Sequence, residues 1–227
     1  MNKKSAKNLV PIFFNNTANS YDVIVNWTTF GRDSFWKHKI LEQLSTEKTV
    51  LDLACGTGIL TRQIAQKIPN AKITGVDITK NYLEKAKEKS KSYKNISFVV
   101  QDAEKLNLGE KFDCITASYL PKYCTSDVLI KNCLEHLNVG GKIILHDFTY
   151  PKNKLIQKMW NFYFKVLHVV GFFIPNWRQV FVELPILIRN TNWVQEYEES
   201  MKACGLKTFK QDLTLGSSSI IVGTKII

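Results

Sequence analysis

From residue 48 onward, short β-rich runs alternate with segments that carry apolar residues at helical spacing. The β-rich runs occupy residues 49–54, 72–78, 96–102, 112–118 and 141–148. Between them lie "ILTRQIAQKI", "KNYLEKAKEK" and "DVLIKNCLEHL", in which apolar residues recur every three or four positions. Consecutive parallel strands need a crossover connection, which is usually a helix. The alternation therefore predicts an α/β fold with a doubly wound, mostly parallel sheet that has helices on both faces.

A chain of 227 residues is short for two domains, so residues 1–227 are expected to form a single domain. The segments outside the alternation are then parts of that domain. Residues 1–45 have aromatic helical patterns and are expected to form a lid over the central unit, residues 46–150. Residues 151–192 are strongly aromatic and predict surface helices that face a substrate or a membrane. Residues 193–227 predict a final helix and two β-rich runs that pair antiparallel, which brings the sheet to seven strands.

Composition narrows the class of protein. The net charge of +11 comes largely from dispersed lysines, so it favours solvated helix faces over specific nucleic-acid binding. The basic N-terminus lacks the apolar core of a signal peptide, and no uncharged run reaches the roughly 18 residues of a spanning helix. Five cysteines form no CxxC pair, and neither a disulfide scaffold nor a metal site is expected. These features predict a cytoplasmic location, and a homodimer is compatible with them.

The segment "VLDLACGTG" reads as a strand that enters a tight ligand-binding turn. Gly56 and Gly58 lack a Cβ atom, so the backbone can turn sharply there and let a ligand approach. A dinucleotide fingerprint requires a glycine or alanine where this chain has Thr61, and a phosphate loop requires a GK[ST] ending that is missing. The turn therefore favours a ligand without a phosphate group.

Three acidic residues follow or end three successive predicted strands. Asp77 can accept hydrogen bonds from both hydroxyls of a ribose, and Asp102 or the backbone near it can read an adenine amino group. Asp52 is expected near enough to the turn to receive an ammonium group. A single aspartate at a strand end is more often a helix cap, but three together favour a ligand site. Such a set suits a cationic nucleoside without phosphate, and S-adenosylmethionine is one.

The same segments resemble class I S-adenosylmethionine-dependent methyltransferases over nearly all of residues 48–227. "VLDLACGTG", "GVDIT", "QDAEKL", "FDCITASY" and "LNVGGKIILHDF" stand in the order and spacing of that superfamily. The resemblance implies a Rossmann-like fold and S-adenosyl-L-methionine as the cofactor. It also implies cofactor contacts from Asp52, Ala54, Gly56, Thr57, Gly58, Asp77, Ile78, Asp102, Ala103 and Ser118.

Within that superfamily the chain is most similar to the MenG/UbiE C-methyltransferases of menaquinone and ubiquinone biosynthesis. The N-terminal segment "FFNNTANSYDVIVNWTTFGRDSFWKHKIL", the proline-led aromatic segment after "LHDF" and the tail "SMKACGLKTFKQDLTLGSSSIIVGTK" all fit that group. The similarity implies methylation of a prenylated quinol precursor such as demethylmenaquinol on a ring carbon. It further implies a lipophilic substrate and peripheral membrane contact on the cytoplasmic face.

Two segments depart from the pattern of that group. Where its members carry Arg and Asn after the fourth strand, this chain has Lys122 and Tyr123 in "LPKY". Lysine keeps the charge of arginine but loses its planar fork, which changes how a quinol oxygen would be held. The segment "VELPILIRNTNW" also differs from the usual sequence before the last helix. Both changes fall in the expected substrate region and leave the cofactor segments intact.

Methylation of a quinol carbon is helped by a base near the ring hydroxyl, because the phenolate is the nucleophile. The candidate catalytic residues are His146, Tyr123, Lys122 and Tyr21, with Asp147 as a further candidate base. His146 has a suitable ordinary pKa, but it also fits a structural histidine at a strand end. Residues 159–173 fit either an apolar substrate pocket or a core-packing helix.

Three other functions stay open at this point. The chain could methylate another small molecule or a lipid, or it could methylate RNA, although it has no separate RNA-binding domain and no NPPY-like stretch. It could also bind the cofactor without turnover. An acceptor panel that contains demethylated quinols, lipids and RNA distinguishes these functions.

Overall fold

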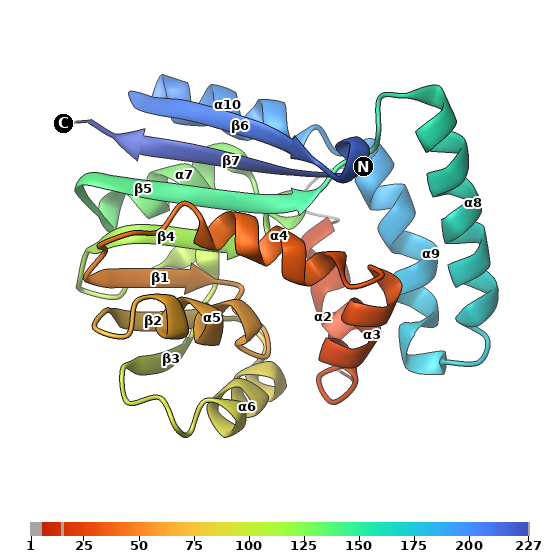
Figure 1. The fold of residues 1–227 in the computed structure, drawn as a ribbon, viewed down its shortest axis with the longest axis horizontal. Helices are drawn as coiled ribbons and strands as arrows, with labels where there is room; N and C mark the ends of the chain where they lie inside the picture. Colours follow the sequence, from red (N-terminus) through yellow and green to blue (C-terminus); the bar gives the residue numbers. More distant parts are fainter. Residues whose placement is uncertain (1–5, 15, 227) are drawn as a thin grey trace.

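A seven-stranded sheet runs through the protein in the order β3-β2-β1-β4-β5-β7-β6 (Figure 1). The computed structural model describes residues 6–14 and 16–226. The sheet is parallel except that β7 runs antiparallel to both β5 and β6. The strands are β1 (Thr49–Leu53), β2 (Lys72–Asp77), β3 (Ile96–Val100), β4 (Phe112–Ser118), β5 (Leu137–Phe148), β6 (Leu206–Leu213) and β7 (Ser218–Lys225). This arrangement confirms the predicted fold class and the predicted C-terminal strand pair.

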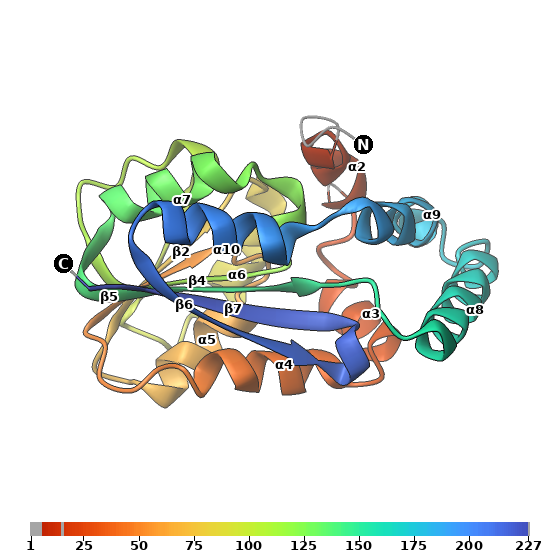
Figure 2. The ribbon, with the colours of Figure 1, turned by 90° about the horizontal axis from the view of Figure 1, so that it is seen from above.

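Helices cover both faces of the sheet, as Figure 2 shows. One face carries α4 (Arg32–Leu41) and α5 (Ile59–Lys67), and the other carries α7 (Ser126–Glu135) and α10 (Trp193–Ala203). A further helix, α6 (Lys80–Lys89), packs against β2 and β3. Buried apolar side chains on both sides of the strands form the two main parts of the core. The central strands are therefore buried on both faces, as their nearly continuous apolar sequences require.

The N-terminal helices divide between two roles. Residues 1–45 were expected to form a lid, but α4 packs on a sheet face, where Trp36 and Ile40 join the core around β1 and α5. Only α2 (Leu9–Phe14) and α3 (Tyr21–Thr28) lie beyond the carboxyl ends of the strands. The apolar face of α4 explains the difference, because its burial against the sheet removes that surface from water. Residues 1–5 and 15 of the predicted lid lie outside the described residues.

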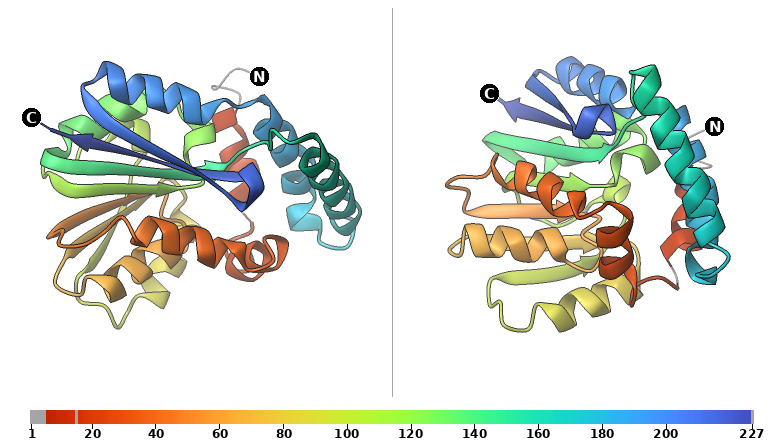
Figure 3. Two further views of the ribbon diagram at one scale, coloured as in Figure 1. Left: turned by 45° about the horizontal axis from the view of Figure 1, so that its top comes forward. Right: turned by 45° about the vertical axis from the view of Figure 1, so that its right-hand side comes forward.

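Four helices gather beyond the carboxyl ends of the strands. The aromatic segment forms α8 (Lys154–Val170) and α9 (Pro175–Asn190), and the two helices pack against each other and beside α2 and α3 (Figure 3). Phe13, Leu167, Trp177 and Phe181 belong to a third, smaller apolar cluster that joins these helices. Two segments that are far apart in the sequence therefore enclose one side of the same edge of the sheet.

Strand order places a binding site at that edge. The chain moves outward from β1 to β2 and β3 in one direction and through β4 and β5 in the other. In open α/β sheets, ligands bind beyond the carboxyl ends of the strands at the point where the order reverses. That point lies between β1 and β4, directly after the glycine turn.

Candidate active site

The turn after β1 is built on left-handed backbone conformations. Ala54, Gly56 and Gly58 have φ angles of 51°, 58° and 76°. Gly58 is also the N-cap of α5, and its left-handed conformation lets the chain enter the helix directly. Such φ angles are strained for residues with a Cβ atom, although Ala54 adopts one, so the backbone favours glycine at positions 56 and 58. The structure thereby explains the spacing "GTG".

Asp77 at the end of β2 is joined to this turn. Its Oδ2 accepts a hydrogen bond of 2.9 Å from the Gly56 amide, and its Oδ1 accepts one of 2.8 Å from the Thr79 amide. Burial raises the pKa of Asp77 above its ordinary value, and the backbone amides oppose that rise. Each carboxylate oxygen can still accept a second hydrogen bond, since it has two lone pairs. Asp77 is thus held rigidly and can receive two vicinal hydroxyls.

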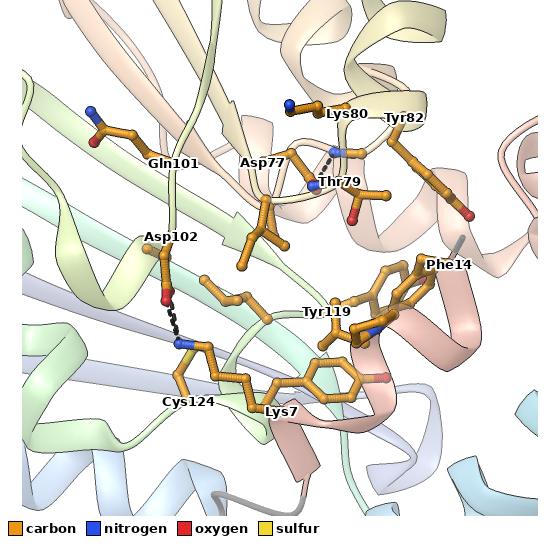
Figure 4. Close-up of a pocket in the computed structure, with 18 of the residues that line it drawn as sticks. Lys7, Phe14, Asp77, Thr79, Lys80, Tyr82, Gln101, Asp102, Tyr119 and Cys124 are labelled. Atoms are coloured by element: carbon orange, nitrogen blue, oxygen red, sulfur yellow. Dashed lines mark hydrogen bonds and ion pairs between the residues drawn. The ribbon is translucent and has the colours of Figure 1, made fainter. Parts of the chain in front are cut away.

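A cavity of about 350 Å³ opens beside Asp77, and we call it the cofactor cavity (Figure 4). It lies beyond the ends of β1, β2, β3 and β4. Seven of the ten residues that the sequence resemblance assigned to the cofactor line it: Ala54, Gly56, Asp77, Ile78, Asp102, Ala103 and Ser118. The tertiary structure therefore brings most of the predicted set together around one space.

Asp102 follows β3, the neighbour of β2, and it also lines this cavity, where it is paired with Lys7 (Figure 4). The Lys7 ammonium donates to Asp102 Oδ1 and Oδ2 at 2.8 and 2.6 Å, and also to Glu104 at 2.6 Å. Asp102 caps the short helical turn η1 (Ala103–Lys105) by accepting from the Glu104 amide at 3.0 Å. Asp102 is thus both a cap and a wall of the cavity.

Several cavity residues were not found from the sequence. Lys7 belongs to a segment that is 95 residues from Asp102 in the chain. Phe14, Tyr82 and Gln101 also line the cavity. Among these residues, only Gln101 could have been predicted to line the site, because it directly precedes the predicted cofactor residue Asp102 in "VVQD". The other contacts depend on how α2 and α6 are placed around the turn.

Three residues predicted to contact the cofactor do not line the cavity: Asp52, Thr57 and Gly58. Asp52 is 1% exposed, and its oxygens accept hydrogen bonds from Thr61 at 2.6 Å and Thr116 at 2.9 Å. Burial raises the pKa of Asp52 to about 6. Asp52 was expected to receive an ammonium group directly or through water, and its enclosure beneath the turn argues against the direct contact only. Thr57 instead donates to Asp22 at 2.5 Å, which joins the turn to α3.

A second cavity of about 420 Å³ adjoins the first, and we call it the aromatic cavity. Its walls come from α3, α8, α9 and the segments after β4 and β5. The two cavities share four side chains in their walls: Phe14, Tyr21, Tyr119 and Tyr123. Tyr119 has a left-handed φ of 69° and stacks on Phe148 with ring centroids 4.8 Å apart. Ligands bound in the two cavities would therefore meet at a rim formed by these four aromatic rings.

Lys122 places a buried charge in the wall of the aromatic cavity. Its ammonium donates to Asp147 Oδ1 at 2.7 Å and to the Tyr119 carbonyl at 2.8 Å, and it lies 4.5 Å from the centroid of the Tyr123 ring. Burial lowers the pKa of Lys122, while Asp147 opposes that change by favouring the cation. Asp147 accepts two backbone amides as well and lines neither cavity. Asp147 is thus the counterion of Lys122, which corrects its expected role as a base.

Tyr21 and Tyr123 line both cavities, but they are not bases at neutral pH. Burial raises the pKa of each phenol well above its ordinary value, so both stay protonated. A protonated phenol can donate a hydrogen bond to an oxygen of a ligand. The two residues can therefore orient a substrate without removing its proton.

His146 is enclosed within the sheet. Its Nδ1 is 2.9 Å from the Ser118 hydroxyl, its Nε2 is 2.7 Å from the Ser218 hydroxyl, and none of its surface is exposed. Burial lowers the pKa of His146 well below its ordinary value, so the ring is neutral. His146 lines neither cavity. The expectation of a direct catalytic contact is therefore corrected, because both ring nitrogens already have partners in the core.

The sheet order, the glycine turn and the acid-lined cavity define a class I S-adenosylmethionine-dependent methyltransferase. Within this class the chain belongs to the ubiE/COQ5 methyltransferase family, whose sequence pattern matches residues 1–225. A demethylmenaquinone methyltransferase from Staphylococcus aureus (strain JH9) is 29% identical over 177 residues, which covers 74% of this chain and 72% of that protein.

Two solved structures share the fold at low sequence identity. The plantazolicin methyltransferase BpumL has a TM-score of 0.66 at 12% identity, with 98% of this chain and 96% of that chain covered. The geranyl diphosphate C-methyltransferase of Streptomyces coelicolor A3(2) has a TM-score of 0.63 at 12% identity, with 86% and 79% covered. At such identities the likeness extends to the fold alone.

The donor set of the cofactor cavity fits S-adenosylmethionine. Asp77 would hold the ribose hydroxyls, and Asp102 with the backbone at Ala103 would lie at the adenine. Lys7 and Lys80 line the cavity together with these two carboxylates, and Lys7 already holds Asp102, so Asp77 is the carboxylate most open to the hydroxyls of a ribose. The aromatic rim shared with the second cavity would surround the methyl-bearing end.

Proposed function

We propose that this enzyme methylates a ring carbon of a reduced, prenylated quinone precursor similar to demethylmenaquinol. The observation that carries the proposal is the aromatic cavity, which adjoins the cofactor cavity through four shared rings. Its wall includes six further aromatic side chains from α8, α9 and neighbouring segments: Phe30, Trp160, Tyr163, Phe164, Trp177 and Phe181. A flat ring with an isoprenoid tail matches such a lining in shape and polarity. The demethylmenaquinone methyltransferase among the relatives supports the same substrate class.

The proposed mechanism depends on a dry, aligned junction between the two cavities. When bound, S-adenosylmethionine supplies an electrophilic methyl group on a sulfonium centre. In a dry junction between the two cavities, alignment of the two ligands lowers the barrier for an in-line displacement.

Lys122 stabilises negative charge on a ring oxygen, because its cation lies in a largely apolar wall where charge interactions are strong. Tyr123 and Tyr21 donate hydrogen bonds that hold the ring in place. The ring hydroxyl loses its proton to solvent as the ring binds beside Lys122, and the methylated carbon loses its proton to solvent after the transfer.

A prenylated substrate also implies peripheral contact with a membrane, since such molecules reside in the bilayer. None of the described helices combines the length and apolar character needed to cross a bilayer. Contact would therefore occur through a surface of the protein.

The deciding experiment supplies labelled S-adenosylmethionine with a panel of reduced demethylated quinols, the corresponding oxidised quinones, lipids and RNA. We expect transfer to the reduced quinol alone, because only the hydroxylated ring ionises to an electron-rich phenolate. NMR must place the methyl group on carbon, since oxygen methylation gives the same mass. Transfer to oxygen, or to lipid or RNA in preference to every quinol, would reject the proposal.

Substitutions in the aromatic cavity test the residue roles. Lys122→Gln should lower kcat and move the rise of the pH–rate profile to higher pH, because the substrate hydroxyl loses the cation that favours its ionised form. Lys122→Arg keeps the charge and should restore most of the turnover and the profile. Tyr123→Phe should lower turnover while cofactor affinity changes little, the pattern of a group that acts in the chemical step. An unchanged profile in Lys122→Gln would remove Lys122 from the mechanism.

A further inference from the structure

We propose that the outer face of α8, together with the end of α3, docks on a bilayer rich in anionic lipids. This inference rests on the proposed function, since it names the source from which the lipophilic substrate enters. The surface is defined by six exposed apolar residues of α8 and the turn after it, and we call it the α8 face: Leu155, Met159, Phe162, Val166, Val169 and Phe173.

The α8 face is a stripe of apolar residues that are all exposed on the surface. Its five members within α8 are spaced by three or four residues, so they lie on one side of the helix, and Phe173 follows in the turn after it. The opposite side of α8 contributes Trp160 and Leu167 to the interior. Figure 3 shows α8 as the outermost helix at this end of the molecule. Phe162 and Phe173 are 68% and 83% exposed, which is costly in water and typical of a surface that has a partner.

The charges around the stripe indicate the chemistry of that partner. Lys152, Lys154, Lys158 and Lys165 are all exposed, and none forms an ion pair with a described side chain. No acidic residue occurs from Pro151 to Val182. Apolar residues flanked by lysines without acids are the pattern of helices that lie in the interface of an anionic membrane.

The aromatic cavity opens beside this face. Phe30, which follows α3, lines the cavity while 78% of its surface is exposed, so it lies at a mouth of the cavity. The same ring lies 5.4 Å from the ring of Tyr163 on α8. A bilayer that contacts the α8 face would therefore lie against the mouth, and a prenylated ring could pass inward without crossing water.

A second copy of the chain is the competing occupant of the α8 face. A two-fold interface pairs a surface with itself, so it would bring the four lysines of one copy toward those of the other. Like charges at an interface disfavour association. Anionic lipid headgroups would neutralise the same lysines, which is why we favour the membrane.

Sedimentation of the full chain with vesicles tests the proposal. We expect binding to an equal mixture of phosphatidylcholine and phosphatidylglycerol, and much weaker binding to phosphatidylcholine alone. Replacing Lys158 and Lys165 with Gln should weaken binding about fivefold for each lysine. The pair Met159→Ser and Phe162→Ser should weaken it by about tenfold or more, since less apolar surface enters the bilayer. Cofactor affinity and melting temperature should stay as in the unmodified chain, because these side chains line neither cavity.

Matched controls lie outside the α8 face. Val139→Ser removes an apolar side chain that is 70% exposed, and Lys87→Gln with Lys91→Gln removes two exposed lysines of the α6 region. These variants should bind vesicles as the unmodified chain does. Equal loss in the control and α8 variants, or no loss in either, would overturn the proposal. So would a dimer in solution that Phe162→Ser converts to a monomer.

The docking proposal and the proposed function fail separately. With a short-tailed, water-soluble quinol, the α8 variants should keep full activity, but with a vesicle-embedded quinol they should lose it. Vesicle binding by a protein that methylates no quinol would reject the function and keep the docking face. Normal vesicle binding by the α8 variants of an active enzyme would reject the docking face and keep the function.

Discussion

The Lys122 ammonium lies 2.7 Å from Asp147 Oδ1, and the two side chains are only 2% and 0% exposed. Lys122 lines the largely aromatic cavity next to the rim shared with the cofactor cavity, whereas Asp147 lines neither cavity. Removing two charges from water costs free energy that only good geometry and further hydrogen bonds offset. Here the Lys122 and Phe148 amides and the Tyr119 carbonyl supply those hydrogen bonds.

Breaking this pair should destabilise the protein strongly. Lys122→Met leaves the Asp147 carboxylate buried without its cation, so we expect the free energy of unfolding to fall by about 3 to 5 kcal/mol. The double variant with Asp147→Asn should recover a large part of that loss, because no uncompensated charge is left. Urea denaturation of both single variants and the double variant measures the coupling. Additive losses would show that the two groups act independently.

Asp77→Ala should weaken S-adenosylmethionine binding by about 1 to 3 kcal/mol through lost hydrogen bonds to the ribose. The same change removes the acceptor of the Gly56 amide, which loosens the turn. Isothermal calorimetry measures the affinity. Glu110→Ala is the control, because this carboxylate pairs with Lys72 at the opposite end of the strands and should leave affinity unaltered. Normal affinity in Asp77→Ala would remove Asp77 from the site.

Gly56→Val should abolish cofactor binding. A Cβ at this position would lie 3.6 Å from the Tyr82 ring, which is an ordinary contact, so the first carbon has room. The obstacle is the φ of 58°, because a β-branched residue strongly disfavours a positive φ. The turn would therefore have to adopt another conformation. Gly140→Val has the same backbone conflict at a φ of 75° with open space around it. It should cost stability without affecting affinity, and equal affinity in both variants would contradict the assignment of the turn.

Asp52 should make the folded state less stable as pH rises from about 4 to about 6. Its pKa of about 6 in the folded protein exceeds that of an unfolded aspartate, so the folded state binds more protons in this interval. A shift of this size corresponds to about 3 kcal/mol. Asp52→Asn should remove that dependence and give a flatter stability curve above pH 4. Chemical denaturation at several pH values measures it.

Asp113 provides a control of opposite sign. Its pKa is lowered in the folded protein, because the Asn138 side chain and the Lys48 and Thr49 amides donate to it despite partial burial. Its stabilisation is therefore present above the unfolded pKa and is lost as the pH falls through the folded value. Asp113→Asn should therefore lower the free energy of unfolding at neutral pH. If the stability of Asp52→Asn still declines between pH 4 and pH 6 as in the unmodified chain, the account of Asp52 is refuted.

The sequence alone determined the fold class, and it placed most of the predicted cofactor residues at one edge of the sheet, because both depend on local patterns. Alternating β-rich and helical segments require a parallel sheet with crossovers, and the end of each strand then falls at one edge. Gly56, Asp77 and Asp102 are placed within a few residues of those strand ends. Their meeting around one cavity therefore followed from strand order, without knowledge of side-chain packing.

Tertiary structure alone decided which polar residues near that edge are free to act. Asp52 and His146 lie on strands as expected, but buried hydroxyls hydrogen-bond to both of them. Thr61 of α5 and Thr116 of β4 donate to Asp52, and the hydroxyls of Ser118 and Ser218 contact the His146 ring. Lys7 reaches the cavity from a segment 95 residues away, and Asp147 is committed to Lys122. A sequence pattern specifies which way a strand runs and where it ends. Whether a side chain there meets solvent, a cavity or a buried partner depends on contacts between segments that are distant in the chain, and local patterns do not encode these contacts.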